Sequence, residues 1–139
     1  MKIYIAASWK HQHAVEMLTE RLRQVGHEVV SFVEEAVEDE GRSDLVFDFD
    51  KWINSADGER KFEYDTNGAT LSDLVIYIGP SGTDAWAEVG AAWGSHVPVV
   101  GLWAKGEPAG LMRKMVTWYY SISELMYELN KLQESVDEQ

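Results

Sequence analysis

The chain has 139 residues, enough for one domain with a hydrophobic core, and it contains no cysteine, which excludes disulfides and zinc–thiolate sites. Its 24 acidic residues outnumber its 12 basic residues and give a formal net charge of -12. This charge argues against polymeric nucleic acid as a partner, because protein cations supply most of that affinity. No apolar run approaches the ~18 residues of a membrane-spanning helix. With no visible secretory signal either, we expect a cytoplasmic protein that binds no membrane.

The first part of the chain is predicted to form a strand, a helix and a second strand. The strands are expected over residues 2–7 and 28–33, and the helix over residues 10–25. Ser8 is placed to cap the start of this helix, and Gly26 to end it. The helix should bury a stripe made of Ala14, Leu18, Leu22 and Val25.

A long acidic segment, residues 34–68, comes next and is rich in aromatic side chains. Short helices are predicted over residues 50–53 and 55–64. Connections of this length inside a compact domain are usually functional or partly helical. Two interpretations stay open: a lid over a site, or a surface excursion whose aromatic side chains pack on the core.

Residues 73–101 form the unit around which the rest is organised. A continuous apolar run over residues 74–78 predicts a strand buried on both faces, and the turn residues 79–83 end it. A helix should follow, up to about residue 94, and then a second buried strand over residues 97–103. Thr83 or Asp84 can cap the start of the helix and Gly94 its end. A parallel strand pair with a right-handed crossover is expected.

The last part of the chain is predicted to form a short helix over residues 109–114 and a strand over residues 116–120. A final helix should start at a capping box, residues 121–124, and continue to about residue 133. Five strands alternating with helices predict one α/β domain, a three-layer sandwich with a five-stranded parallel sheet. The expected strand order is flavodoxin-like, 2-1-3-4-5. Ligands of such sheets bind at the carboxyl ends of the strands, where the small residues Ala7 and Ser8 leave room.

Glu88 is an acid one turn into the central helix, and its neighbours are small or apolar. A carboxylate in such surroundings faces either solvent or a functional site. Taken alone, a solvated helix residue is the simpler interpretation of this position.

Three groups of residues resemble the nucleoside 2-deoxyribosyltransferase family, and they span nearly the whole chain. They are the start, KIYIAASW, the D-x-N-G segment Asp65-Thr66-Asn67-Gly68, and the unit SDLVIYIGPSGTDAWAEVGAAWGSHVPVVGL. The stretches GHEVVSF, PSG…AEVG and EP…LM are similar to a branch of small, prophage-associated members.

The resemblance implies an enzyme that cleaves the N-glycosidic bond of a deoxyribonucleoside or its monophosphate, with Glu88 as nucleophile. A carboxylate can attack C1′, release the base and hold a covalent glycosyl-enzyme intermediate, which water or a second base then resolves with net retention. Two other classes stay open. One is a nucleotide-binding or sequestering module without turnover, and the other is a redox flavodoxin-like protein, disfavoured because the first loop lacks a phosphate cradle rich in serine and threonine.

The resemblance also assigns roles to three further side chains. Asp65 matches an aspartate that binds the base and manages its proton, although an Asx-turn residue is an alternative compatible with that role. Tyr4 matches a tyrosine whose hydroxyl touches the nucleophile, and its alternative is a core aromatic. Trp9 matches an aromatic residue of the base pocket, and its alternative is packing at the entry of a helix.

One position departs from the family pattern. Gly82 stands where deoxynucleoside-specific members carry an aspartate that grips the sugar hydroxyls, six residues before the nucleophile. Asp84, on the same helix face as Glu88, either replaces that acid or caps the helix. The loop of Ser81, Gly82 and Thr83 could instead take a 5′-phosphate at the helix N-terminus. Nucleoside and nucleotide therefore both stay open as substrates.

No cofactor and no metal are expected. The four histidines, His11, His13, His27 and His96, do not have the spacing of a metal site. The family usually forms dimers or larger assemblies, which predicts a homodimer or higher homo-oligomer here. Such a surface, or alternatively the core, would use the aromatic residues Trp93, Trp118, Tyr119 and Tyr127.

Overall fold

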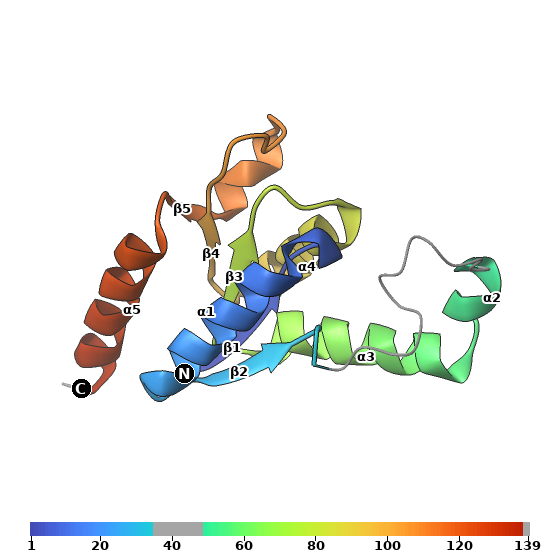
Figure 1. Ribbon diagram of the computed structural model, residues 1–139, viewed down its shortest axis with the longest axis horizontal. Coiled ribbons are helices and arrows are strands. Elements are labelled where there is room, and N and C mark those ends of the chain that lie inside the picture. Colours follow the sequence, from blue (N-terminus) through green and yellow to red (C-terminus); the bar gives the residue numbers. More distant parts are fainter. Residues whose placement is uncertain (35–48, 138–139) are drawn as a thin grey trace.

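The computed structural model describes residues 1–34 and 49–137 (Figure 1). Its five strands form one parallel sheet in the order β2-β1-β3-β4-β5, which confirms the predicted flavodoxin-like α/β fold. The strands are β1 (Lys2–Ala6), β2 (Glu28–Ser31), β3 (Leu74–Ile78), β4 (Val99–Leu102) and β5 (Thr117–Tyr119). The helices are α1 (Gln12–Gln24), α2 (Phe49–Ile53), α3 (Ala56–Leu71), α4 (Thr83–Gly94) and α5 (Ile122–Asp137), with 3-10 turns at η1 (Trp9–His11) and η2 (Leu111–Met115).

Helices cover both faces of the sheet, and the alternation of side chains along β1 decides which residue meets which helix. Ile3 and Ile5 pack in a core with Leu18 and Leu22 of α1 and with residues of α5. Tyr4 and Ala6 point to the opposite face, where α3 and α4 lie. Tyr4 is therefore on the face of the sheet that α4, the helix of Glu88, covers.

Helix α3 corrects the prediction for residues 55–68. The structure has one continuous helix, Ala56–Leu71, where a short helix and a turn were expected, so the Asx-turn interpretation of Asp65 is wrong. Ser55 caps its start, since its hydroxyl accepts a hydrogen bond from the Gly58 N–H at 3.1 Å. In Figure 1, α3 extends beyond the sheet and carries α2 at its far end. Of the lid-like segment predicted over residues 34–68, residues 35–48 lie outside the described residues, and the lid stays a prediction.

Several predicted helix ends are also wrong. Ser8 makes no cap bond to its own helix, because its hydroxyl accepts the N–H of Gly82 instead. The N-cap of α4 is Gly82, rather than Thr83 or Asp84. Gly94 is the last helical residue of α4, and the positive φ of 63° that follows the helix is at His96.

Two further details differ from the predicted pattern. In α1 the buried residues are Val15, Leu18, Thr19 and Leu22, whereas Val25 follows the helix and is 51% exposed. Helix α5 starts as predicted, with the Ser121 hydroxyl accepting the N–H of Glu124 at 3.1 Å, but it continues to Asp137. Within the described part of the chain, no helix has the length and apolar character needed to cross a bilayer.

Candidate active site

The candidate site is built around a hydrogen bond between β1 and α4. The Tyr4 hydroxyl donates to Oε1 of Glu88 at 3.0 Å, and the Tyr4 side chain is fully buried. The contact that the resemblance implied for these two residues is therefore present. Because both side chains come from regular elements, the carboxylate has a fixed orientation instead of the freedom of a solvated helix residue.

Helix α3 brings a second carboxylate to the same place. Oδ1 of Asp65 lies 3.3 Å from the ammonium group of Lys61, one turn earlier on the helix. Lys61 is 3% exposed and donates to the backbone oxygen of Phe32 at 2.6 Å. Lys61 is not among the predicted site residues, because lysine in an acidic segment has no local signal that distinguishes a buried cation from a solvated one.

The surroundings raise the pKa of Glu88 from 4.5 to about 8. Burial is the largest cause, because it disfavours the charged form, and the negative charges of Asp65 and Asp84 act in the same direction. The hydrogen bond from Tyr4 and the positive charge of Lys61 oppose the rise. Burial and the negative charges of Glu88 and Asp65 also raise the pKa of Tyr4, so the phenol stays protonated and donates.

A cavity of about 340 Å³ opens onto these groups between α2, α3 and α4. This volume is within the range of small-molecule sites. Glu88, Asp65, Asp84 and Lys61 supply its charged wall. Its aromatic side chains are Phe49, Trp52 and Phe62, which the sequence analysis placed in the lid-like segment but not in the site.

The remaining predicted binding residues lie elsewhere. Among the residues that the structure describes, the cavity lining does not include the six positions Ala7, Ser8, Trp9, Ser81, Gly82 and Thr83. Trp9 packs edge-on against Phe32, with ring centroids 5.2 Å apart, on the α1 side of the sheet. The aromatic side chains that line this cavity therefore come from α2 and α3, and the binding roles of the six other positions stay predictions.

The predicted phosphate loop is tied to the first loop by two reciprocal hydrogen bonds. The Ser8 N–H donates to the Ser81 hydroxyl at 2.9 Å, and the Gly82 N–H donates to the Ser8 hydroxyl at 2.7 Å. The Ser81 hydroxyl donates in turn to the Ile78 carbonyl at 2.6 Å. These bonds join the ends of β1 and β3 and so fix the start of α4 relative to Tyr4.

Glu107, which the sequence analysis did not identify as functional, supports this loop from behind. It is 8% exposed, and the Tyr77 hydroxyl lies 2.8 Å from each of its oxygens. The same hydroxyl accepts the Ser81 N–H at 2.9 Å, and Trp86 Nε1 donates to Glu107 at 3.2 Å. A Cβ at Gly79 would lie 2.3 Å from Glu107 Oε2, so a side chain there would displace this carboxylate from its hydrogen bonds. Glu107 thus contributes to the geometry of the loop that leads into α4.

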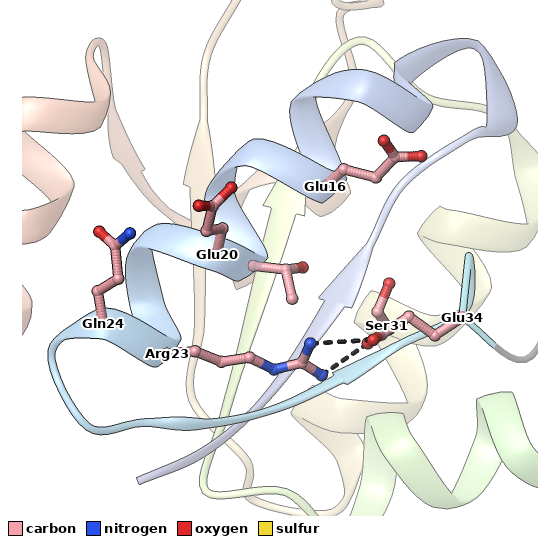
Figure 2. A pocket seen from close by; sticks show the side chains of 7 residues that line it. Glu16, Glu20, Arg23, Gln24, Ser31 and Glu34 are labelled. Carbon is pink, nitrogen blue, oxygen red and sulfur yellow. Dashed lines mark hydrogen bonds and ion pairs between the residues drawn. The ribbon is translucent and has the colours of Figure 1, made fainter.

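A second hollow lies between α1 and β2, away from the predicted residues (Figure 2). Arg23 is its cation, and its guanidinium donates to the two oxygens of Glu34 at 2.9 and 2.6 Å and to the Val29 carbonyl at 3.0 Å. Glu16 and Glu20 add negative charge to the same wall. The guanidinium of this hollow is thus already bound to a carboxylate and a carbonyl.

The proposed oligomer surface is only partly exposed. Trp93 and Tyr127 are 60% and 63% exposed. Trp118 instead packs against the rings of Tyr77, Trp86 and Trp103. The homo-oligomer stays a prediction.

Gly68 explains why Tyr4 can lie where it does, and it leads to a testable prediction. A Cβ at this position would be 2.3 Å from Tyr4 Cδ1, so Gly68→Ala should displace the ring and weaken its bond to Glu88. We expect a net loss of about 1–2 kcal/mol in the free energy of unfolding, because overpacking outweighs the better helix propensity of alanine. Any activity that depends on Glu88 should fall about tenfold or more, because the Tyr4 hydroxyl would no longer orient the carboxylate. Urea unfolding and the activity assay described below measure both effects.

Gly90→Ala is the matched control for this prediction. Gly90 is in the interior of α4, and a Cβ there would meet nothing within 4 Å. This variant should gain about 0.5–1 kcal/mol from helix propensity alone. Equal stability changes at Gly68 and Gly90 would contradict the proposed role of Gly68.

Comparison with known proteins relates the architecture, though not the sequence, to solved structures. No protein-family model and no curated protein sequence matches the chain. A 2-deoxyribosyltransferase from Bacillus psychrosaccharolyticus is similar, with a TM-score of 0.69 and 20% identity over 90% of each chain. A CMP N-glycosidase of Clostridium botulinum has a TM-score of 0.59 and 19% identity over 94% of this chain and 98% of its own.

A conserved protein from Enterococcus faecalis V583 is also similar, with a TM-score of 0.68 and 17% identity over 94% of this chain and 98% of its own. Of the structures named here, the 2-deoxyribosyltransferase and the CMP N-glycosidase are enzymes that carry nucleoside or nucleotide chemistry in their names. Because the similarity covers nearly the full length of each chain, this protein shares their complete fold and not only a common strand-helix unit.

Proposed function

We propose that this protein is a member of the nucleoside 2-deoxyribosyltransferase family that cleaves the N-glycosidic bond of a (deoxy)nucleoside or nucleoside monophosphate. The observation that carries the proposal is the Glu88 carboxylate, held by the Tyr4 hydroxyl at 3.0 Å and facing a cavity of about 340 Å³ together with Asp65. The sequence motifs and the shared fold of a 2-deoxyribosyltransferase and a CMP N-glycosidase support it.

In this mechanism Glu88 is the nucleophile. One of its oxygens forms a bond to C1′ of the sugar while the bond between C1′ and the base nitrogen breaks, and the electron pair of that bond leaves with the base. The departing base takes up a proton from a water molecule that we assign to Asp65. Water or a second base then attacks C1′ and loses its proton to solvent through the same water, while the bond between C1′ and Glu88 breaks. This step frees the Glu88 carboxylate and gives net retention of configuration.

The cavity offers suitable groups for both halves of such a substrate. Phe49, Trp52 and Phe62 can stack on a base, since aromatic rings prefer offset or edge-on contacts with other flat rings. Asp84 lines the cavity one turn before Glu88, so we assign it the sugar hydroxyls that an acid at position 82 would otherwise bind.

Base release should depend steeply on pH. Only the carboxylate form of Glu88 is nucleophilic, and its pKa is raised to about 8. We therefore expect kcat/KM to rise about tenfold per pH unit below that value and to level off above it. Initial rates measured between pH 5 and 10 test this, and a flat profile across pH 6 to 9 would contradict it.

The function itself is tested with a panel of substrates. Purine and pyrimidine deoxynucleosides, ribonucleosides and their 5′-monophosphates are each incubated with the protein, with and without a second free base, and the bases are separated by chromatography. Base release or exchange is the expected result, together with a glycosyl adduct on Glu88 in the mass spectrum of the quenched protein. If no member of the panel releases or exchanges its base, the proposal is wrong.

A binding module without turnover is the second candidate, and one observation favours it. With a pKa of about 8, Glu88 is mostly protonated at neutral pH, and a neutral carboxyl group binds polar ligands but is a poor nucleophile. Under this alternative, calorimetry would show tight binding of a nucleoside or nucleotide that is recovered unchanged after long incubation at pH 9.

A further inference from the structure

Lys61 is a buried cation in the wall of the proposed site. Of the described residues that line the cavity, it alone carries a positive charge, while Glu59, Asp65, Asp84 and Glu88 all carry acidic groups. Burying an ammonium group costs free energy unless opposite charge and hydrogen bonds compensate it. A lysine at this position therefore needs a physical reason.

The contacts of Lys61 hold its ammonium group in one place. It donates to the Phe32 carbonyl at 2.6 Å and lies 3.3 Å from Oδ1 of Asp65. It also lies 5.5 Å from the centre of the Phe32 ring and 5.3 Å from that of the Tyr64 ring, both within cation–π range. The carbonyl and the rings fix the ammonium group independently of Asp65, so the charge is preorganised beside the carboxylate.

We propose that Lys61 is a positioning residue whose charge offsets that of Asp65 and thereby lets Glu88 become the reactive carboxylate. Two carboxylates that share a small cavity disfavour each other's ionisation, and a fixed cation beside one of them reduces this repulsion. Asp65 then stays oriented toward the base, while Glu88 can lose its proton and attack the sugar. The assignment of these two roles rests on the proposed function, but the electrostatic effect does not.

The charged and titratable groups around Glu88 come from three elements. Tyr4 of β1 donates a hydrogen bond to it, Asp65 and Lys61 of α3 face it, and Asp84 precedes it by one turn on α4. Glu59 of α3 lines the same cavity. Of these, the Tyr4 hydrogen bond and the Lys61 charge favour the ionised form of Glu88, whereas Asp65 and Asp84 oppose it.

The direct test measures the titration of Glu88 by carboxyl ¹³C NMR, with the Glu88 signal assigned by its absence in Glu88→Gln. Lys61→Gln removes the charge but keeps a donor for the Phe32 carbonyl. We expect the Glu88 midpoint to rise by roughly half a unit to one unit in this variant. An unchanged midpoint in the folded variant would overturn the proposal and leave Lys61 as a purely structural anchor.

Arg60→Gln is the matched control, because it makes the same charge change at the neighbouring position. The Arg60 side chain is 59% exposed and pairs with Asp57 at 3.4 Å. This variant should leave the Glu88 midpoint unchanged. An equal shift in both variants would mean that net charge, and not the buried ammonium group, sets the effect, and would overturn the proposal.

A second pair of variants covers the case in which Lys61→Gln fails to fold because it leaves Asp65 without its cation. Asp65→Asn alone should lower the Glu88 midpoint, and adding Lys61→Gln to it should raise the midpoint again. Equal midpoints in these two proteins would overturn the proposal.

Turnover separates this inference from the proposed function. If substrates react, the pH at half-maximal kcat/KM should shift in Lys61→Gln by the same amount as the NMR midpoint, and a profile that does not move would count against the positioning role. If no substrate reacts, the proposed function fails, while the NMR titrations still decide whether Lys61 controls the ionisation of Glu88.

Discussion

Replacement of Glu88 by glutamine should lower the rate of base release by about a thousandfold or more. Glutamine has nearly the same size, and its amide oxygen can still accept the hydrogen bond that Tyr4 donates to Oε1. It cannot form the covalent bond to C1′, and it carries no charge to stabilise the cationic character of the transition state. Single-turnover measurements at pH 9, where the wild-type carboxylate is ionised, would give the full difference.

Glu63→Gln makes the same chemical change at an exposed position of α3 that does not line the cavity. Its turnover should equal that of the unmodified protein, and circular dichroism should show that both variants are folded. Sodium azide added to Glu88→Ala provides a further check, because a small anion can occupy the space of the missing carboxylate and attack C1′ itself. A Glu88→Gln protein that keeps a tenth or more of the wild-type rate would exclude Glu88 as nucleophile.

The sheet and its order follow from signals that are local in the sequence. Apolar runs such as residues 74–78 indicate buried strands, and the alternation of strands and helices leaves few possible topologies. Side chains alternate between the two faces of a strand, so Tyr4 lies on the face of the sheet away from Ile3 and Ile5. This is the face that the helix of Glu88 covers. This much of the site depends only on the pattern along the chain.

The misjudged parts depend on contacts between distant residues. Asp65-Thr66-Asn67-Gly68 has the composition of a turn, yet the segment is helical, and its glycine leaves room for the ring of Tyr4, which occupies the space where a side chain would be. Ser8 looks like a helix cap, but its hydroxyl is already bonded to the N–H of Gly82, 74 residues away. In both cases a tertiary partner replaced the local interaction that the sequence suggested.

Lys61 and Glu107 could not be found from the sequence for a related reason. Both are charged residues in polar stretches, where exposure is the usual state. Lys61 is buried by Phe32 and Tyr64, and Glu107 by Tyr77 and Trp86. Only the folded arrangement of these aromatic residues distinguishes the two charges from their solvated neighbours.

The contribution of Glu88 to the free energy of unfolding should decrease as the pH rises from about 4.5 to about 8. The unfolded chain releases the Glu88 proton near 4.5, whereas the folded protein keeps it up to about 8. Between these values the folded state binds more protons, so stability falls with pH. Each unit of pKa corresponds to about 1.4 kcal/mol, so this group accounts for at most about 5 kcal/mol across the window.

Urea unfolding at pH 5, 6, 7, 8 and 9 measures the effect when wild type and Glu88→Gln are compared. The neutral variant lacks this titration, so the stability of Glu88→Gln relative to wild type should grow steadily up to pH 8 and then stay constant. The variant that loses catalysis should therefore be the more stable protein at pH 8, because the cavity wall holds a carboxylate whose ionisation its surroundings disfavour. A constant difference between pH 5 and 9 would show that Glu88 ionises as easily in the folded protein as in the unfolded chain, which contradicts a desolvated nucleophile beside Asp65.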